Sequence, residues 1–300
     1  MKYLVLSLIT MVLFSCNDAK EHTKGAIKKA PQTIDKGVES FEEVLPFDSI
    51  YNTHNDTELR KTKSIVIKRQ NLIDKKDDKL ELETLVIQKT FNKEEDLYLI
   101  DFTYPYLNEN LKESYHNFNE YLEKTYMDIA GVEASILEDK ELICDTLHIN
   151  RFKEKRFVDY KIYNRNEKLI SVLFYKENYY AGTLHPSYTF DCLNFDLERS
   201  VFMNYEDFFN KGTEEEMTTI LNEVLTEKIN SGDIYYDCWE ISFEDFFEYK
   251  DNFVIDDLKV EYYFDDCIMC PSYTGTFSIE IPLERLLPVL RKYKLNPLIL

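Results

Sequence analysis

The fold of this chain is decided by the stretch Leu169–Phe209, which reads LISVLFYKENYYAGTLHPSYTFDCLNFDLERSVFMNYEDFF. Apolar, β-branched and aromatic runs flank the connection Ala181–Pro186, and such runs are typical of strands. The connection holds Gly182, one of only seven glycines, and His185, one of five histidines. We therefore predict a strand, a tight connection, a second strand, a turn and a closing segment at Asn204–Phe209.

Outward from this stretch, the pattern predicts short strands joined mostly as hairpins. The further strands are expected at Ser64–Lys68, Leu80–Gln88, Leu97–Tyr104, Val158–Tyr163, Asn252–Ile255, Lys259–Phe264 and Phe277–Ile281. Helices are expected along an apolar stripe from Leu107 to Tyr126, after capping boxes at Thr213–Glu216 and Ser242–Asp245, and at Leu283–Lys292. Strands and helices do not alternate regularly, which favours an α+β fold of antiparallel sheets with hairpins and packed amphipathic helices.

The N-terminus reads as an export signal. A lysine at position 2 precedes an apolar run that is too short to span a bilayer comfortably as a mature helix. Leu13–Cys16 resembles the lipobox of bacterial lipoproteins, in which the cysteine carries a diacylglycerol. We predict lipid attachment at Cys16 and a place in the bacterial cell envelope, periplasmic or surface-exposed, with membrane contact through this lipid only. The alternative is an ordinary cleaved signal peptide with an incidental cysteine.

Composition excludes some classes of partner. The chain carries 56 acidic and 36 basic residues and a formal charge of −20, so it repels nucleic-acid phosphates and anionic headgroups. A charge of this sign attracts basic proteins, although it also serves as a plain solvated surface. We expect no nucleic-acid partner.

Motifs for catalysis and cofactor binding are missing from the sequence. It contains no G-x-S-x-G elbow, no H-E-x-x-H zinc motif and no glycine-rich nucleotide loop. Asp191 and Asp196 are conceivable as an acid and base pair, but chance explains two carboxylates among 56 better. We expect no enzyme activity, no cofactor and no metal.

The cysteines allow more than one interpretation. Cys267 and Cys270 form a C-x-x-C, which without a second ligand pair favours structural thiols or one or two disulfides over a redox or metal site. Without Cys16, five cysteines remain, so at least one thiol stays unpaired within the chain.

Several short motifs occur in this chain in the same order as in a known family. They are Gly182–Pro186, Asn194–Leu197, Glu206–Phe209, Tyr262–Phe264, Pro271–Gly275 and Ile281–Leu286. Together they resemble the extracytoplasmic domain of unknown function shared by the anti-sigma factor RsiV and the peptidoglycan deacetylase PdaC. The match covers about Val158 to Leu290, and Phe102–Leu107 resembles the small domain that precedes it. Two departures are Ser272, inserted after Pro271, and Ser200, where the family commonly has a turn glycine.

The resemblance implies a domain order and a function class. We expect a signal peptide over residues 1–16, a tether over 17–61, a small α+β domain over 62–155 and the family domain over 156–300. The family domain is not the catalytic part of the deacetylase, and in the anti-sigma factor it binds lysozyme. The expected function is therefore a lipid-anchored binding or sensing module of the envelope. The alternatives are an accessory subunit or enzyme of peptidoglycan or polysaccharide processing, and a structural envelope protein without a small ligand.

The expected ligand-binding residues are Pro271, Tyr273 and Gly275, with His185 nearby. Tyr273 lies in a loop bounded by proline and glycine, where a rigid aromatic can anchor an interface. The implied partner is a basic protein such as a lysozyme-type muramidase, or a cell-wall glycan. The plainer alternatives are that Tyr273 fills the core and that His185 bonds to local backbone.

Overall fold

The computed structural model describes residues 68–142, 153–180, 183, 186–271 and 274–299. The lipid-attachment residue Cys16, the tether and nearly all of the strand predicted at Ser64–Lys68 lie outside these residues. Lys68 itself is helical, in a segment whose described part covers residues 68–74. None of the helices described is both long and apolar enough to cross a bilayer.

Within the described residues, six strands form the larger sheet. They are β1 (Val86–Glu94), β2 (Tyr98–Leu107), β3 (Glu154–Arg165), β4 (Leu169–Tyr179), β5 (Ser187–Asp196) and β6 (Val201–Met203). Their order in the sheet follows their order in the chain. All neighbours are antiparallel except β2 and β3, which pair in parallel from Tyr98–Glu154 to Phe102–Val158. One sheet therefore runs across the domain boundary predicted between residues 155 and 156.

A smaller antiparallel sheet and several helices complete the fold. The strands are β7 (Phe253–Ile255), β8 (Lys259–Tyr263) and β9 (Ser278–Pro282). The helical segments are η1 (Glu113–Tyr115), α2 (His116–Tyr121), the π-helical η2 (Leu122–Met127), α3 (Ile129–Leu142), α4 (Tyr205–Phe208), α5 (Glu214–Ser231), α6 (Phe243–Tyr249) and η6 (Leu283–Leu286). This mixture of helices with mixed and antiparallel sheets confirms the predicted α+β class.

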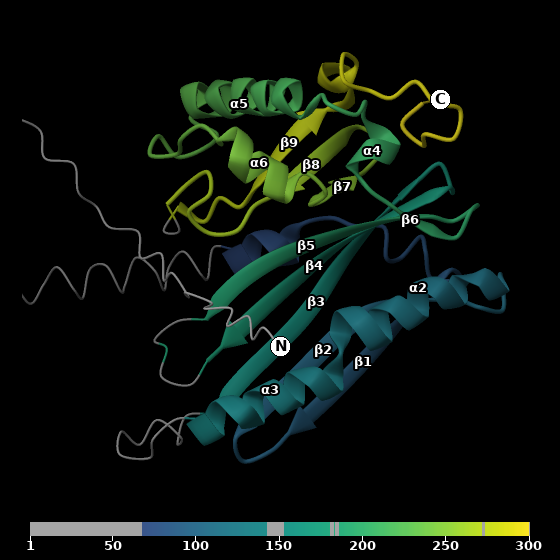
Figure 1. Ribbon diagram of the computed structural model, residues 1–300, viewed down its shortest axis with the longest axis vertical. Coiled ribbons are helices and arrows are strands. Elements are labelled where there is room, and N and C mark those ends of the chain that lie inside the picture. Colours follow the sequence, from purple (N-terminus) through teal and green to yellow (C-terminus); the bar gives the residue numbers. More distant parts are fainter. Residues whose placement is uncertain (1–67, 143–152, 181–182, 184–185, 272–273, 300) are drawn as a thin grey trace, which may run out of the picture. The chain divides into compact units, whose positions relative to one another are not determined.

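The elements stack in layers with three apolar cores between them (Figure 1). Helices α2 and α3 cover one face of the large sheet, where Phe118, Leu122 and Ile136 are buried. The opposite face meets the small sheet through a core that includes Leu173, Phe190, Val254 and Tyr263. Helices α5 and α6 cover the outer face of the small sheet. Each layer thus buries its apolar side against a neighbour, as the hydrophobic effect requires.

Two predicted strands differ from the observed ones. The strand predicted at Leu80–Gln88 begins only at Val86, and Leu80 lies in the preceding turns with 82% of its surface exposed. The strand predicted to stop at Pro105 runs on to Leu107. Pro105 is tolerated because pairing with β3 ends at Phe102, so no bond to β3 requires its missing N–H.

The first long helix is also displaced. It was predicted from Leu107, but Leu107 belongs to β2, and Leu111 is 58% exposed. Helical structure begins at Glu113 and continues, with a break at Asp128, to Leu142. The buried side chain of Asn119 explains the offset, because it binds both the backbone N–H and the carbonyl of Leu107 and fixes the strand end against the helix.

The ends of the remaining helices agree with the prediction only in part. Helix α6 has the expected cap, with Ser242 Oγ accepting from the Asp245 amide at 3.0 Å. Helix α5 ends at Gly232 with φ +82°, the left-handed conformation that glycine adopts at low cost. The Thr213 box does not form, because Thr213 Oγ1 donates to the Asn210 carbonyl instead. The predicted last helix shrinks to Leu283–Leu286.

Candidate functional site

The predicted ligand loop is only partly described. Tyr273 and His185 lie outside the described residues, so their placement is not tested. The Pro271 carbonyl accepts from the Thr274 amide at 3.0 Å and from Thr274 Oγ1 at 2.9 Å. Gly275 follows with φ +73°, which a side chain would strain. Two hydrogen bonds thus join Thr274 to Pro271.

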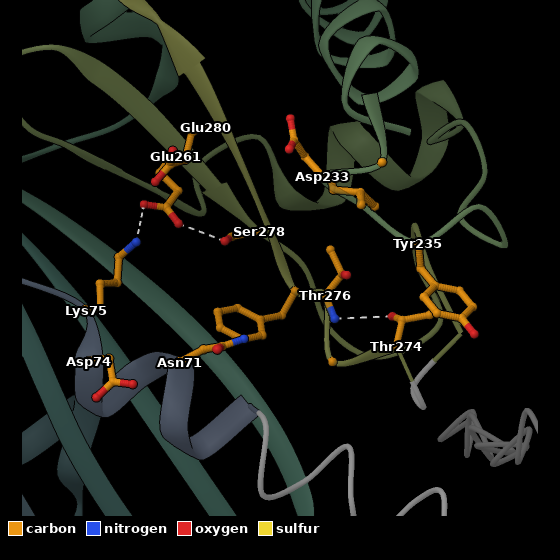
Figure 2. A pocket seen from close by; sticks show the side chains of 14 residues that line it. Asn71, Asp74, Lys75, Asp233, Tyr235, Glu261, Thr274, Thr276, Ser278 and Glu280 are labelled. Atoms are coloured by element: carbon orange, nitrogen blue, oxygen red, sulfur yellow. Dashed lines mark hydrogen bonds and ion pairs between the residues drawn. The ribbon is translucent and has the colours of Figure 1, made fainter. Parts of the chain in front are cut away.

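Gly275 lines a pocket of about 630 Å³, which we call the acidic pocket. Its described walls come from the helix over residues 68–74 with Lys75, from residues 232–235 just after α5, from Glu261 of β8, and from residues 274–278 with Glu280. Figure 2 shows these side chains converging from separate elements. The predicted loop therefore borders a cavity rather than a flat surface.

Carboxylates dominate the charge of this pocket. Among the described residues, Asp74, Asp233, Glu261 and Glu280 line it, together with one lysine, Lys75. Glu261 is only 3% exposed, and it accepts from Lys75 Nζ at 2.5 Å and from Ser278 Oγ at 2.7 Å (Figure 2). These two donors compensate the cost of burying the Glu261 carboxylate. The other three acids are closer to solvent and give the pocket a net negative potential.

The exposed aromatic side chain of Tyr235 lines the pocket, and two more exposed aromatics follow it in the chain. Tyr235 lines the pocket with 48% of its surface exposed, and its ring stacks on Tyr236 with centroids 5.0 Å apart. Trp239 is held by its indole N–H, which donates to the Ile268 carbonyl at 2.9 Å. The disulfide Cys238–Cys270 ties the aromatic segment 235–239 to the segment that leads into the predicted loop. Rigid, half-exposed aromatics of this kind are typical of binding surfaces.

The disulfide settles one of the alternatives left by the sequence. Cys270 bonds to Cys238 and not to its C-x-x-C neighbour Cys267. Cys192 is a free, buried thiol, and burial raises its pKa well above the ordinary range. Within the part of the chain described, no group of three or more acidic, histidine or cysteine side chains is arranged to hold a metal.

The two carboxylates considered as an acid–base pair are not together. Asp191 and Asp196 stand five positions apart on β5, so they point to opposite faces of the sheet. Asp191 pairs with Lys176 at 2.7 Å and accepts from the Tyr126 hydroxyl, and Asp196 pairs with Arg199 at 2.7 Å. Both carboxylates are engaged in structural contacts.

A second pocket was not foreseen from the sequence. This cavity of about 520 Å³, which we call the β3–β4 groove, lies between the helix over residues 68–74 and strands β3 and β4. Half-buried Phe157 and Tyr175 line it. At one end Arg69 binds both carboxylate oxygens of Glu177, at 2.6 and 2.5 Å, and this pairing raises the pKa of the guanidinium.

Sequence reasoning also missed most of the acidic pocket. Of the residues that line the pocket it identified Gly275, but not Asp233, Tyr235 or Glu261. The aromatic run between Ile234 and Trp239 was the available signal, since exposed aromatic clusters mark interaction surfaces. The carboxylates gave no signal, because they come together only in the folded chain.

Comparison with known proteins identifies the fold but not a function. No protein-family model and no curated protein matches this chain. The crystal structure of a DUF3298 family protein from Pseudomonas aeruginosa PAO1 matches with a TM-score of 0.50 at 12% identity, covering 69% of this chain and 93% of that one. A DUF3298 family member from Bacteroides fragilis gives a TM-score of 0.44 at 16% identity, over 70% of this chain and 95% of that one. The fold of this chain is therefore similar to that of a DUF3298 family protein.

Proposed function

We propose that this chain is a lipid-anchored binding module of the bacterial envelope, which captures a basic protein such as a lysozyme-type muramidase at the acidic pocket. The observation that carries the proposal is that Gly275, in the loop expected to bind, lines a cavity whose described walls hold four carboxylates and one lysine. A lysine or arginine side chain of the partner fits such a cavity by charge.

Electrostatics support the proposal at long range as well. A formal charge of −20 speeds the encounter with a cationic protein, and salt weakens this attraction. At short range, the half-exposed ring of Tyr235 can bury apolar surface or lie against a cationic group. The disulfide Cys238–Cys270 holds the segment around Tyr235 in place before binding, which lowers the entropic cost of association.

Titration calorimetry of the full-length protein with lysozyme tests the pocket. We expect binding that weakens as salt is raised, and a loss of about 2 kcal/mol or more for Tyr235→Ala or Tyr273→Ala if either ring anchors the interface. Asp233→Asn should weaken binding by a smaller amount, mostly through the association rate. Tyr293→Ala is the matched control, because Tyr293 is exposed to a similar degree (40%) but does not line the pocket. Absence of binding by the wild type at low salt refutes the proposal.

The anchor is tested separately. Metabolic labelling with a fatty-acid probe should mark the wild-type protein and leave Cys16→Ala unmarked, because Cys16 is the only lipobox cysteine. Equal labelling of both proteins would contradict lipid attachment at this residue.

A second candidate is binding of a cell-wall glycan in the β3–β4 groove. The observation that favours it is the combination of the aromatic side chains of Phe157 and Tyr175 with the fixed polar pair Arg69–Glu177. Apolar walls with a few convergent polar groups are the usual composition of small-molecule sites. Tyr175→Ala should then abolish retention on peptidoglycan fragments, while Tyr235→Ala should leave retention unchanged. The reverse pattern would exclude this groove.

A further inference from the structure

Strand β9 forms one edge of the small sheet. It is last in the order β7-β8-β9, and in the part of the chain that the structure describes it pairs only with β8. At the start of this pairing the Phe264 amide donates to the Phe277 carbonyl at 2.9 Å. Hydrogen-bonded pairs alternate with unbonded pairs along an antiparallel ladder, so the main-chain groups of Ser278 and Glu280 point away from β8.

The main-chain groups on this edge have no partner. Within the described residues, no hydrogen bond is made by the N–H or the carbonyl of Ser278 or Glu280. Both residues are half-buried rather than buried. Pro282 follows with the same alternation, and its missing N–H is tolerated because that side of the strand makes no bond to β8. A strand edge with free donors and acceptors is a template for another strand.

Two cavities meet at this edge. The acidic pocket is lined by Glu280 and by residues 232–235, just after α5. A cavity of about 480 Å³ shares Glu280 with it and also contains Pro282. Its wall on the side of α5 is made by Val224, Glu227 and Lys228.

The faces of β9 show where these cavities run. Ile279 and Ile281 are buried in the core under α5, so the side chain of Glu280, between them, points to the opposite face of the sheet. A cavity that touches both α5 and Glu280 therefore lies at the edge of the sheet. We call the two cavities together the β9–α5 groove.

We propose that the β9–α5 groove binds an extended basic segment of a protein partner, which adds to β9 as a further strand. The main chain of the segment bonds to Ser278 and Glu280, and its side chains on one face enter the acidic pocket, where Glu261 and Glu280 lie opposite each other. The inference rests on the proposed function for the class of partner, a basic protein, and adds the way in which that partner is held.

The charges of the groove fix where the basic side chains belong. The described walls of the acidic pocket hold four carboxylates and one lysine. In the second cavity the charges are largely paired, because Arg285 binds both carboxylate oxygens of Glu227, at 2.5 and 2.7 Å, and Lys259 pairs with Glu280. Lysine or arginine is therefore favoured at the end of the segment that lies in the acidic pocket.

The test is titration calorimetry of the full-length protein at low salt with a nine-residue peptide of alternating lysine and threonine, blocked at both ends. Two further peptides carry N-methyl groups on every lysine or on every threonine. Successive residues of a strand direct their N–H groups to opposite sides, so only one of these peptides loses its bonds to β9. We expect that peptide to bind about tenfold or more weakly, and the other to bind like the unmodified one.

A pair of variants places the peptide on β9. Ser278→Pro removes the outward N–H without touching the ladder to β8, and it should weaken binding of the unmodified peptide about fivefold. Ser278→Ala is the matched control, because it loses the same hydroxyl bond to Glu261 but keeps the N–H, and it should change the affinity less. Circular dichroism checks that both variants are folded. The two methylated peptides decide the question on the wild-type protein even if the proline variant is not.

Strand addition is overturned if the unmodified peptide does not bind, if the two methylated peptides bind equally, or if folded Ser278→Pro binds as well as Ser278→Ala. These outcomes are separate from the proposed function. Lysozyme binding that depends on Tyr235 can persist when strand addition fails, and the peptide pattern can hold for a protein that does not bind lysozyme.

Discussion

The side chain of Asn252 binds the backbone of Cys192: Asn252 Oδ1 accepts from the Cys192 amide at 2.7 Å. Its Nδ2 donates to the carbonyls of Phe190, at 2.8 Å, and Tyr263, at 3.0 Å. Cys192 and Phe190 belong to β5 of the large sheet, and Tyr263 belongs to β8 of the small one. One side-chain amide therefore joins the two sheets through three hydrogen bonds. Without it, these three backbone groups would need water molecules inside the core as partners.

Replacing this amide should cost much of the stability of the domain. Asn252→Ala leaves backbone groups of both sheets without partners in a buried place, and we expect a loss of about 3 kcal/mol or more. Urea denaturation followed by circular dichroism measures it. Asn92→Ala, at an exposed position of β1, is the control and should change the midpoint little. Equal midpoints for the two variants would contradict this role.

The disulfide should be a major stabilising element. Cys238 and Cys270 are 32 residues apart, and closing a loop of that length restricts the unfolded chain by about 3–4 kcal/mol in the chain-entropy description. The double variant Cys238→Ser, Cys270→Ser should therefore unfold at a clearly lower urea concentration. It should also weaken ligand binding at Tyr235, which lines the acidic pocket. Unchanged stability would mean that packing alone holds this segment.

The hairpin between β3 and β4 offers a stabilising substitution. Asn166 and Glu167 occupy its turn with φ of +52° and +53°. Asparagine tolerates this conformation, but glutamate is strained by its Cβ. Glu167→Gly should raise the free energy of unfolding by about 0.5–1 kcal/mol, net of the greater entropy of glycine in the unfolded chain. Lys168→Gly, where φ is not positive, should lower it by a similar amount. A lower midpoint for Glu167→Gly would contradict the strain.

A buried acid should give the protein a distinctive dependence on pH. Burial raises the pKa of Asp265, although the Tyr249 hydroxyl donates to it at 3.2 Å. The folded state then binds a proton more readily than the unfolded state. This group destabilises the fold at neutral pH, and the cost disappears as the pH falls through its raised pKa toward the ordinary value of about 3.9.

Asp265→Asn should therefore stabilise the protein at neutral pH and remove this component of the pH dependence. Thermal unfolding between pH 4 and pH 7.5 measures both effects. Asp266→Asn is the informative comparison, because Asp266 pairs with the buried ammonium of Lys68 and its loss should destabilise. Stabilisation by both variants would point to general charge repulsion instead.

Local patterns in the sequence predicted most helices and strands, but they did not predict the long-range contacts between them. The turn residues Asn164–Glu167 predicted the β3–β4 hairpin, and Ser242 predicted the cap of α6, because both structures form among neighbours in the chain. The parallel pairing of Phe102 with Val158 gave no signal, since its register depends on packing between distant segments. The same holds for the acidic pocket. A local loop motif predicted Gly275, whereas Glu261 and Asp233 come near it only in the folded protein and could not be predicted.

The chain order of strands β1 to β6 has a consequence for how the protein is made. Each new strand pairs with the one synthesised just before it, so the large sheet can be extended from its N-terminal edge while translation continues. The small sheet joins last, when Asn252 becomes available to bind β5. During that interval the part of this face around Phe190 lacks the cover of the small sheet, and this is the period in which the nascent protein is most exposed to aggregation and to proteases.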